Sequence, residues 1–165
     1  MHPEALAWVA EYAPATGDPA SVLDIGGRDI NGSPRPLFPT TSRYVTLDAL
    51  PGADITADAS TWVPDAAYDA VVCTEVFEHA ECWRAILVTA FLACAPGGHL
   101  IITCAGPGRA VHSGVDGGPA LHPGEWYANV PADDLRSALV AVGWHVVACE
   151  DLGADTRAYA IKEPQ

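Results

Sequence analysis

The stretch SVLDIGGRDINGS, residues 21–33, decides the fold of this chain. An apolar run ends in Asp24, Gly26 and Gly27 follow at once, and Gly32 comes later. A strand that ends in an acid and turns through glycines brings backbone close to a ligand at the carboxyl edge of a parallel sheet, where open α/β sheets bind their ligands. The stretch therefore predicts a ligand-binding edge on an α/β fold.

The rest of the chain agrees with this fold class, because short β-rich runs alternate with helical patterns. The predicted strands cover 21–25, 43–48, 53–58, 68–75 and 98–106, followed by a hairpin-like pair at 144–151 and 157–163. The predicted helices cover 3–13, 81–94 and 131–142, and the sequence PGG ends the second of them. We expect one domain over residues 1–165, in which 1–20 form an N-terminal helix and linker.

Composition limits the function. The 165 residues include 8 Lys plus Arg against 21 Asp plus Glu, a formal net charge of -13, which disfavours nucleic-acid binding. The first 18 residues contain no Lys or Arg and carry Glu4 and Glu11, so they fit neither a secretory signal nor a membrane span. The five cysteines form no C-x-x-C pair and mostly lie in apolar runs. These features predict a soluble cytoplasmic protein with reduced core cysteines.

The opening turn distinguishes between two cofactors. A dinucleotide site needs G-x-G-x-x-G, whereas Arg28, Asp29 and Ile30 follow the glycine pair here. An acid at the end of the first strand would repel a pyrophosphate but suits a ligand with ammonium and sulfonium centres. S-adenosylmethionine is such a ligand.

At this point the chain resembles the class I S-adenosylmethionine-dependent methyltransferases, from Ser21 to about Glu150. The resemblance is carried by VLDIGG, YVTLDA, TADAS, CTEVFEH and APGGHLIIT. It implies a Rossmann-like three-layer sandwich, with a mostly parallel seven-stranded sheet whose last strand is antiparallel. It also implies methyl transfer from S-adenosylmethionine.

The resemblance assigns cofactor contacts to particular residues. Asp24 would lie near the methionine part, Asp48 would hold the ribose hydroxyls, and Asp58 would meet the adenine amino group. Glu75 and Glu78 belong to the segment that closes over the methionine end. The remaining residues of the implied cofactor set are Gly26, Gly27, Ala49 and Ala59. The spacing from Gly26 to Asp48 also meets the need for a ribose acceptor roughly 20 residues after the turn.

The first motif departs from the usual D-x-G-x-G-x-G. Arg28 and Ile30 stand where this family most often has glycine. The turn instead resembles a subset of small methyltransferases whose first crossover helix is short. Pro34, Pro36 and Pro39 agree with that, since prolines in the interior forbid a normal helix.

Glu75, Glu78 and His79 allow a second interpretation. Some ubiquinone-pathway and small-RNA 3′-end methyltransferases have a resembling E-x-x-E-H that holds magnesium, and carboxylates suit that ion. The same letters occur in relatives without metal, where they shape the cofactor pocket. We predict no metal, and keep metal-assisted transfer to an RNA end or a protein as the alternative. A second alternative is a relative that binds the cofactor without catalysing methyl transfer.

Residues 106–130 form a long loop rich in Gly, Pro and His. A loop of that length inside a compact domain is usually functional or disordered, and its aromatic residues favour order. We expect it to cover the acceptor side, with His112 or His122 as the catalytic base and Trp126 and Tyr127 as the floor. No N/D-P-P-Y/F motif follows the fourth strand, so we predict O- or N-methylation of a small molecule. A homodimer that helps to cover the substrate is an open alternative.

Overall fold

The computed structural model describes residues 2–30 and 32–164. A seven-stranded sheet has the order β3-β2-β1-β4-β5-β7-β6. Its strands are β1 (Ser21–Ile25), β2 (Arg43–Asp48), β3 (Ile55–Thr56), β4 (Tyr68–Thr74), β5 (Cys94–Ala105), β6 (His145–Leu152) and β7 (Asp155–Ile161). Strands β1 to β5 pair in parallel, while β7 is antiparallel to both β5 and β6. The predicted mostly parallel sheet with an antiparallel last strand is confirmed.

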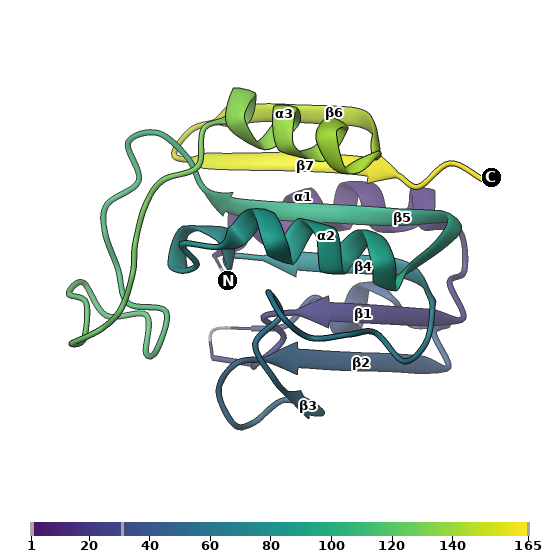
Figure 1. Ribbon diagram of the computed structural model, residues 1–165, viewed down its shortest axis with the longest axis horizontal. Helices are drawn as coiled ribbons and strands as arrows, with labels where there is room; N and C mark the ends of the chain where they lie inside the picture. Colours follow the sequence, from purple (N-terminus) through teal and green to yellow (C-terminus); the bar gives the residue numbers. More distant parts are fainter. Residues whose placement is uncertain (1, 31, 165) are drawn as a thin grey trace.

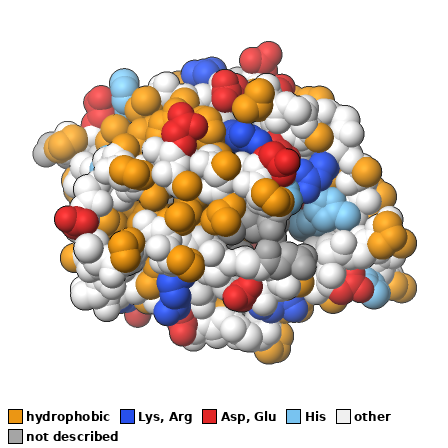
Figure 2. All heavy atoms as spheres, turned by 180° about the vertical axis from the view of Figure 1, so that it is seen from behind, with side chains coloured by type: hydrophobic (Ala, Val, Ile, Leu, Met, Phe, Trp, Pro, Cys, Tyr) orange, Lys and Arg blue, Asp and Glu red, His pale blue; other side chains and the backbone are white. Residues whose placement is uncertain are grey.

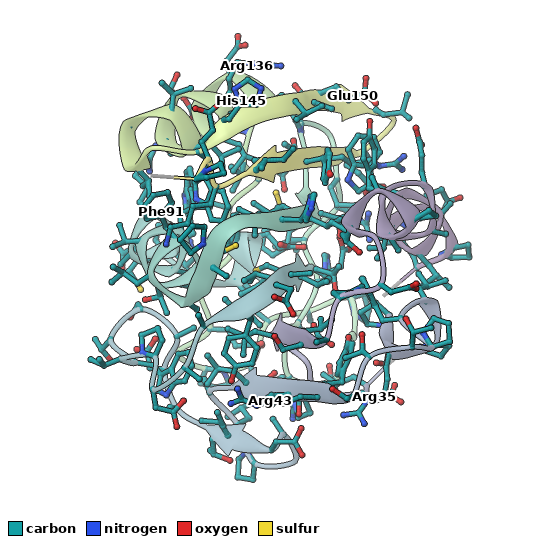
Figure 3. All side chains as sticks on the ribbon, turned by 90° about the vertical axis from the view of Figure 1, so that its right-hand side faces the viewer. Arg35, Arg43, Phe91, Arg136, His145 and Glu150 are labelled. Carbon is teal, nitrogen blue, oxygen red and sulfur yellow. The ribbon has the colours of Figure 1, made fainter. Side chains whose placement is uncertain are left out.

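Helices cover both faces of the sheet and give three layers (Figures 1 and 3). The helix α1 (Pro3–Tyr12) lies behind the sheet in Figure 1, whereas α2 (Trp83–Ala93) and α3 (Ala132–Val142) lie in front of it. Three short 3₁₀ helices complete the described elements: η1 (Ala13–Thr16), η2 (Arg35–Leu37) and η3 (Phe77–His79). Among the described residues between β1 and β2, only η2 is helical, in agreement with the short crossover that the prolines predicted.

The buried face of α1 contains its largest apolar side chain. Ala5, Trp8 and Val9 pack against the sheet, whereas Leu6 is 37% exposed. The buried face includes the indole of Trp8, the largest apolar side chain of the helix, whose Nε1 also donates to the Ala158 carbonyl oxygen at 3.4 Å. Apolar area therefore decided the orientation of the helix.

Several helix and strand boundaries differ from the predicted ones. The second helix ends at Ala93 because Pro96 disfavours helical backbone before it, and the PGG sequence lies inside β5 rather than in a helix end. The pairing of β4 with β5 shifts register there, between Tyr68 and Ala70. The predicted strand at 53–58 shortens to β3, which pairs only with the last two residues of β2.

The cysteines are all free. Cys73, Cys94 and Cys104 are buried in the core as predicted, Cys149 is half-buried, and Cys82 is exposed just before α2. Among the described residues, the helices are too short or too polar to cross a lipid bilayer.

Strands β1, β2, β4 and β5 all point to one side of the molecule, the left in Figure 1. The long segment between β5 and α3 leaves the sheet on that side. The turn after β1, the end of β4 and this segment therefore meet at one edge, which is where ligands bind in such sheets.

Candidate functional site

The turn after β1 is built from glycine because backbone passes very close to its neighbours. Gly26 has φ of 78°, and its N–H donates to the Leu47 carbonyl oxygen at 2.7 Å. A Cβ on Gly26 would lie 2.2 Å from Cγ2 of Val76, and one on Gly27 would lie 2.8 Å from the Asp24 carbonyl oxygen. Close packing of the protein on itself therefore requires glycine at both positions, and the approach of this turn to a ligand stays a prediction.

Two adjoining cavities open beside this turn. We call the first the β2-side cavity, with a volume of about 420 Å³, and the second the loop-side cavity, with about 540 Å³. Both volumes lie in the usual range of small-ligand sites. The residues that line both cavities are Gly26, Arg28, Ile30, Glu75, His79 and Gly114. The cavities are therefore neighbouring halves of one site.

The β2-side cavity contains the residues predicted after the second and third strands. They are Asp48, Ala49, Asp58 and Ala59. Asp48 accepts the Leu50 N–H and Asp58 accepts the Ser60 N–H, each at 2.8 Å and each through Oδ1. Both carboxylates are thus fixed by their own turns on one wall of the cavity, where they suit hydroxyl and amino donors of a ligand.

Asp24 lines neither cavity. Val22 packs against α1, and Asp24, two residues further along β1, lies on the same face of the sheet. There the Tyr44 hydroxyl donates to Oδ2 of Asp24 at 2.8 Å. Its Oδ1 is buried without a hydrogen-bond partner among residues 2–30 and 32–164. Burial raises the pKa of Asp24 to about 7, although the hydrogen bond from Tyr44 acts in the opposite direction.

Glu75 lies at the junction of the two cavities in a strained conformation. Its φ of 58° is a positive value for a residue other than glycine. Its Oε1 accepts the Thr103 hydroxyl at 3.0 Å, and its Oε2 lies 3.2 Å from Nε2 of His2 and 3.4 Å from Nη2 of Arg109. Burial by itself raises the pKa of Glu75, but the bond from His2 and the charges of His2 and Arg109 outweigh burial and lower it. Strain held by such a network is typical of functional positions.

Glu78, His79 and His112 lie close together at the loop-side cavity, which both histidines line. Glu78 is fully buried, and both its carboxylate oxygens lack partners among the residues described. Burial, followed by the charge of Glu75, raises the pKa of Glu78 to about 8. Burial, followed by the charge of His112, lowers the pKa of His79 to about 4. One ligand atom from each of Glu78, His79 and His112 lies within 4.8 Å of the others.

The two histidines predicted as bases lie in different places. His112 lines the loop-side cavity, and its ring packs edge to face on His79, with centroids 4.9 Å apart. His122 lines neither cavity; its side chain is 50% exposed and its Nε2 lies 3.0 Å from Oδ2 of Asp116. Tyr127 packs against His112 at 5.1 Å.

The loop itself is tied down over the site. Oε1 of Glu125 accepts the Gly114 N–H at 2.9 Å and the Val115 N–H at 3.2 Å. Nη2 of Arg28 donates to the carbonyl oxygens of the same two residues, at 3.3 Å for Gly114 and 3.1 Å for Val115. A Cβ on Gly114 would lie 2.9 Å from the His79 ring. The loop therefore lies directly on His79. The back view in Figure 2 shows histidine, arginine and acidic side chains gathered on this side of the molecule.

Sequence reasoning missed three charged residues of the site: His2, Arg28 and Arg109. Arg28 drew notice only as a departure from glycine. His2 and Arg109 lie 73 and 34 residues from Glu75 in the chain, so no local pattern joins them. Only the packing of α1 and the start of the loop brings them to the end of β4.

The chain was compared with known proteins. A family model described as "Methyltransferase domain" matches residues 1–149. The comparison with curated proteins finds no match. Among solved structures, the N-methyltransferase NodS from Bradyrhizobium japonicum WM9, in complex with S-adenosylhomocysteine, has a TM-score of 0.71 at 17% identity, over 96% of this chain and 86% of that chain.

Two further structures are similar to this chain. The amino pentose methyltransferase CalS10 from Micromonospora echinaspora, bound to S-adenosylmethionine, has a TM-score of 0.69 at 18% identity, over 96% of this chain and 90% of that chain. The sugar N-methyltransferase KedS8 from Streptoalloteichus sp ATCC 53650 has a TM-score of 0.73 at 13% identity, over 98% of this chain and 87% of that chain. Because the sequence identities lie between 13% and 18%, these similarities show a shared fold and no more.

Proposed function

The chain belongs to the methyltransferase-domain family, and from this membership we propose that it transfers a methyl group from S-adenosylmethionine to a hydroxyl or amine of a small molecule. One observation carries the proposal: two adjoining cavities share Glu75 and Gly26, with Asp48 and Asp58 on the wall of one and His112 on the wall of the other. A transferase that joins a cofactor to an acceptor needs two such neighbouring spaces.

The residues present fit this cofactor. S-adenosylmethionine, when bound, supplies an electrophilic methyl group on a sulfonium. Asp48 and Asp58 offer carboxylates to the hydroxyl and amino groups of its nucleoside part, and Ala59 offers a backbone N–H. Gly26 has to be glycine, because any Cβ there would meet Val76. The lowered pKa of Glu75 keeps a negative charge at the junction, which suits the cationic groups of the cofactor.

The acceptor would occupy the loop-side cavity. There the loop holds Gly114 against His79, where it would help to keep water from the bound reactants. Such transfer is accelerated mainly by alignment and exclusion of water. His112 is our candidate for the group that removes the proton from the acceptor, because it lines this cavity and His122 does not. Neighbours that methylate amino sugars agree with a small-molecule acceptor, and the acid-rich composition disfavours a nucleic acid.

A thermal-shift screen tests the proposal directly. S-adenosylmethionine and S-adenosylhomocysteine should each raise the melting temperature, because ligands that bind only the folded state stabilise it. NAD should not. Stabilisation by NAD alone would contradict the proposal, and stabilisation by both adenosyl ligands without methyl transfer to any amine or alcohol would favour the non-catalytic alternative.

Asp48→Ala should weaken the binding of S-adenosylhomocysteine by about 1 to 3 kcal/mol, because ribose hydroxyls would lose a charged acceptor. Folding should survive, since Asp48 ends β2 at a partly exposed position. Titration calorimetry measures the change, and Asp65→Ala, an exposed acid that lines neither cavity, controls for net charge. Equal affinity of the Asp48 variant and the wild type would remove Asp48 from the cofactor site.

The metal-assisted alternative has one observation in its favour, the grouping of Glu78, His79 and His112. Two features oppose it. Glu75, which the E-x-x-E-H interpretation requires, is turned toward His2, Arg109 and Thr103 instead. Glu78 is wholly covered, and its raised pKa favours the protonated form, which is a poor ligand for magnesium.

Chelation should therefore leave the affinity for S-adenosylhomocysteine and any methyl transfer unchanged. The measurement compares calorimetry and activity before and after EDTA treatment. A sample dialysed in parallel without EDTA serves as the control for the treatment itself. Loss of activity that Mg²⁺ or Mn²⁺ restores would favour the metal-assisted enzyme and its RNA-end or protein acceptor.

A further inference from the structure

Arg28, the residue that replaces a glycine in the first motif, lies across the site. It is one of the residues that line both cavities. Its stem lies near Gly52, where an added Cβ would be 3.5 Å from Cγ and Cδ of Arg28. The guanidinium reaches the loop and donates through Nη2 to the carbonyl oxygens of Gly114 and Val115. The side chain thus connects the turn after β1 with the acceptor-side loop.

The charge of Arg28 is not balanced within the described part of the chain. No carboxylate of residues 2–30 and 32–164 lies within 4 Å of its guanidinium, and its Nε is buried without a hydrogen-bond partner. The other arginine that lines a cavity, Arg109, contacts both Asp155 and Glu75. Nη2 already donates to two carbonyl oxygens and Nε is enclosed, so Nη1, which donates to no described group, is the donor left for a ligand. A carboxylate is the acceptor that would also balance the charge.

Arg28 and Glu75 carry opposite charges on the walls of the same two cavities. An α-amino-acid group carries a carboxylate and an ammonium, so this pair of side chains has the complementary charges. Within the proposed function, S-adenosylmethionine brings such a group to the site. A neutral or purely cationic ligand would leave Arg28 uncompensated.

We propose that Arg28 binds the carboxylate of the cofactor's amino-acid end and, through the same guanidinium, holds the Gly114–Val115 segment of the loop over the acceptor cavity. The inference rests on the proposed function. It makes Arg28 a binding residue in place of a motif glycine, and it couples cofactor binding to the order of the loop, because one side chain contacts both.

Calorimetry with two ligands tests this assignment: S-adenosylhomocysteine, and its decarboxylated form, which lacks only the carboxylate. Arg28→Met should lower the affinity for S-adenosylhomocysteine by roughly 10- to 30-fold, the scale of a hydrogen bond between charged groups. It should leave the affinity for the decarboxylated ligand within about twofold of the wild-type value. Arg28→Lys should fall in between, because it keeps the charge and loses the fork.

Arg35→Met is the matched control. Arg35 is exposed at the outer side of β2, donates to the Tyr44 carbonyl oxygen and lines neither cavity (Figure 3). Its substitution should change neither affinity. Circular dichroism and melting temperature establish that each variant is folded.

Hydrogen exchange supplies a second readout. In the wild type, S-adenosylhomocysteine should slow exchange of the amides of residues 113–117, and the decarboxylated ligand should do so less. In Arg28→Met the two ligands should have equal effects. Equal loss of affinity for both ligands in Arg28→Met, or no loss for either, would overturn the assignment while leaving the proposed function intact. Failure of the wild type to bind either ligand would instead overturn the proposed function.

Discussion

Replacing His112 by alanine is expected to lower turnover about 100-fold at saturating cofactor, with cofactor affinity unchanged, which is the usual contribution of a general base. His112 lines the loop-side cavity, the same cavity that Glu75 reaches from the end of β4. The edge-to-face contacts with His79 and Tyr127 fix its ring. Removal of the acceptor's proton is therefore the step that its imidazole can serve.

His122→Ala is the matched control, since it removes the same group from the same loop. His122 is half exposed, bound to Asp116, and outside both cavities. Its substitution should leave turnover within about twofold of the wild-type value, as for most surface changes. Comparable turnover in both variants would contradict a basic role for His112, and the loop would then act by alignment and exclusion of water alone.

Asp24→Asn is expected to raise the free energy of unfolding at pH 8 by about 4 kcal/mol. Burial raises the pKa of Asp24 from 3.8 to about 7 in the folded protein. The folded state holds the Asp24 proton more tightly than the unfolded state. The carboxyl therefore makes its full contribution to the free energy of unfolding only below pH 3.8. This contribution is lost between pH 3.8 and about 7, at about 1.4 kcal/mol per pH unit. The amide of asparagine has no such charge to bury.

Urea unfolding at pH 5, 6, 7 and 8 measures this difference between variant and wild type. Tyr44→Phe should act in the opposite direction, because the Tyr44 hydroxyl stabilises the charged form of Asp24. That variant should lose more stability at pH 8 than at pH 5. A pH-independent difference between Asp24→Asn and the wild type would show that Asp24 is not the group that titrates in this range.

The β2-side cavity follows closely from sequence. Gly26, Asp48 and Asp58 each stand at or just after the end of a predicted strand, and parallel strands end at one edge. Local pattern is sufficient for such residues, because the strand that carries them also aims them. The loop-side cavity does not follow in this way. His112 and His122 have the same chemistry and the same loop, and no periodicity within a loop separates them.

Asp24 shows that a residue in a recognised motif can have an environment that the sequence does not predict. Its place at the end of β1 follows from sequence, but the face on which its carboxylate lies depends on strand alternation and on Tyr44 in the neighbouring strand. The burial that raises its pKa comes from α1 packing over that face. An acid in a motif can therefore be wholly enclosed in the core.

The sequence by itself determined the α/β class, the strand-end acids, the glycine turn and the long loop, because each depends on local propensity, on periodicity or on a short motif. The tertiary structure alone decided how His2, Arg109 and Glu75 meet, and that Arg28 reaches across the turn to Gly114 and Val115. These contacts join residues that are 34 to 87 positions apart in the chain. Distances between such residues depend on how helices and loops pack on the sheet, and no local pattern in the sequence records that packing.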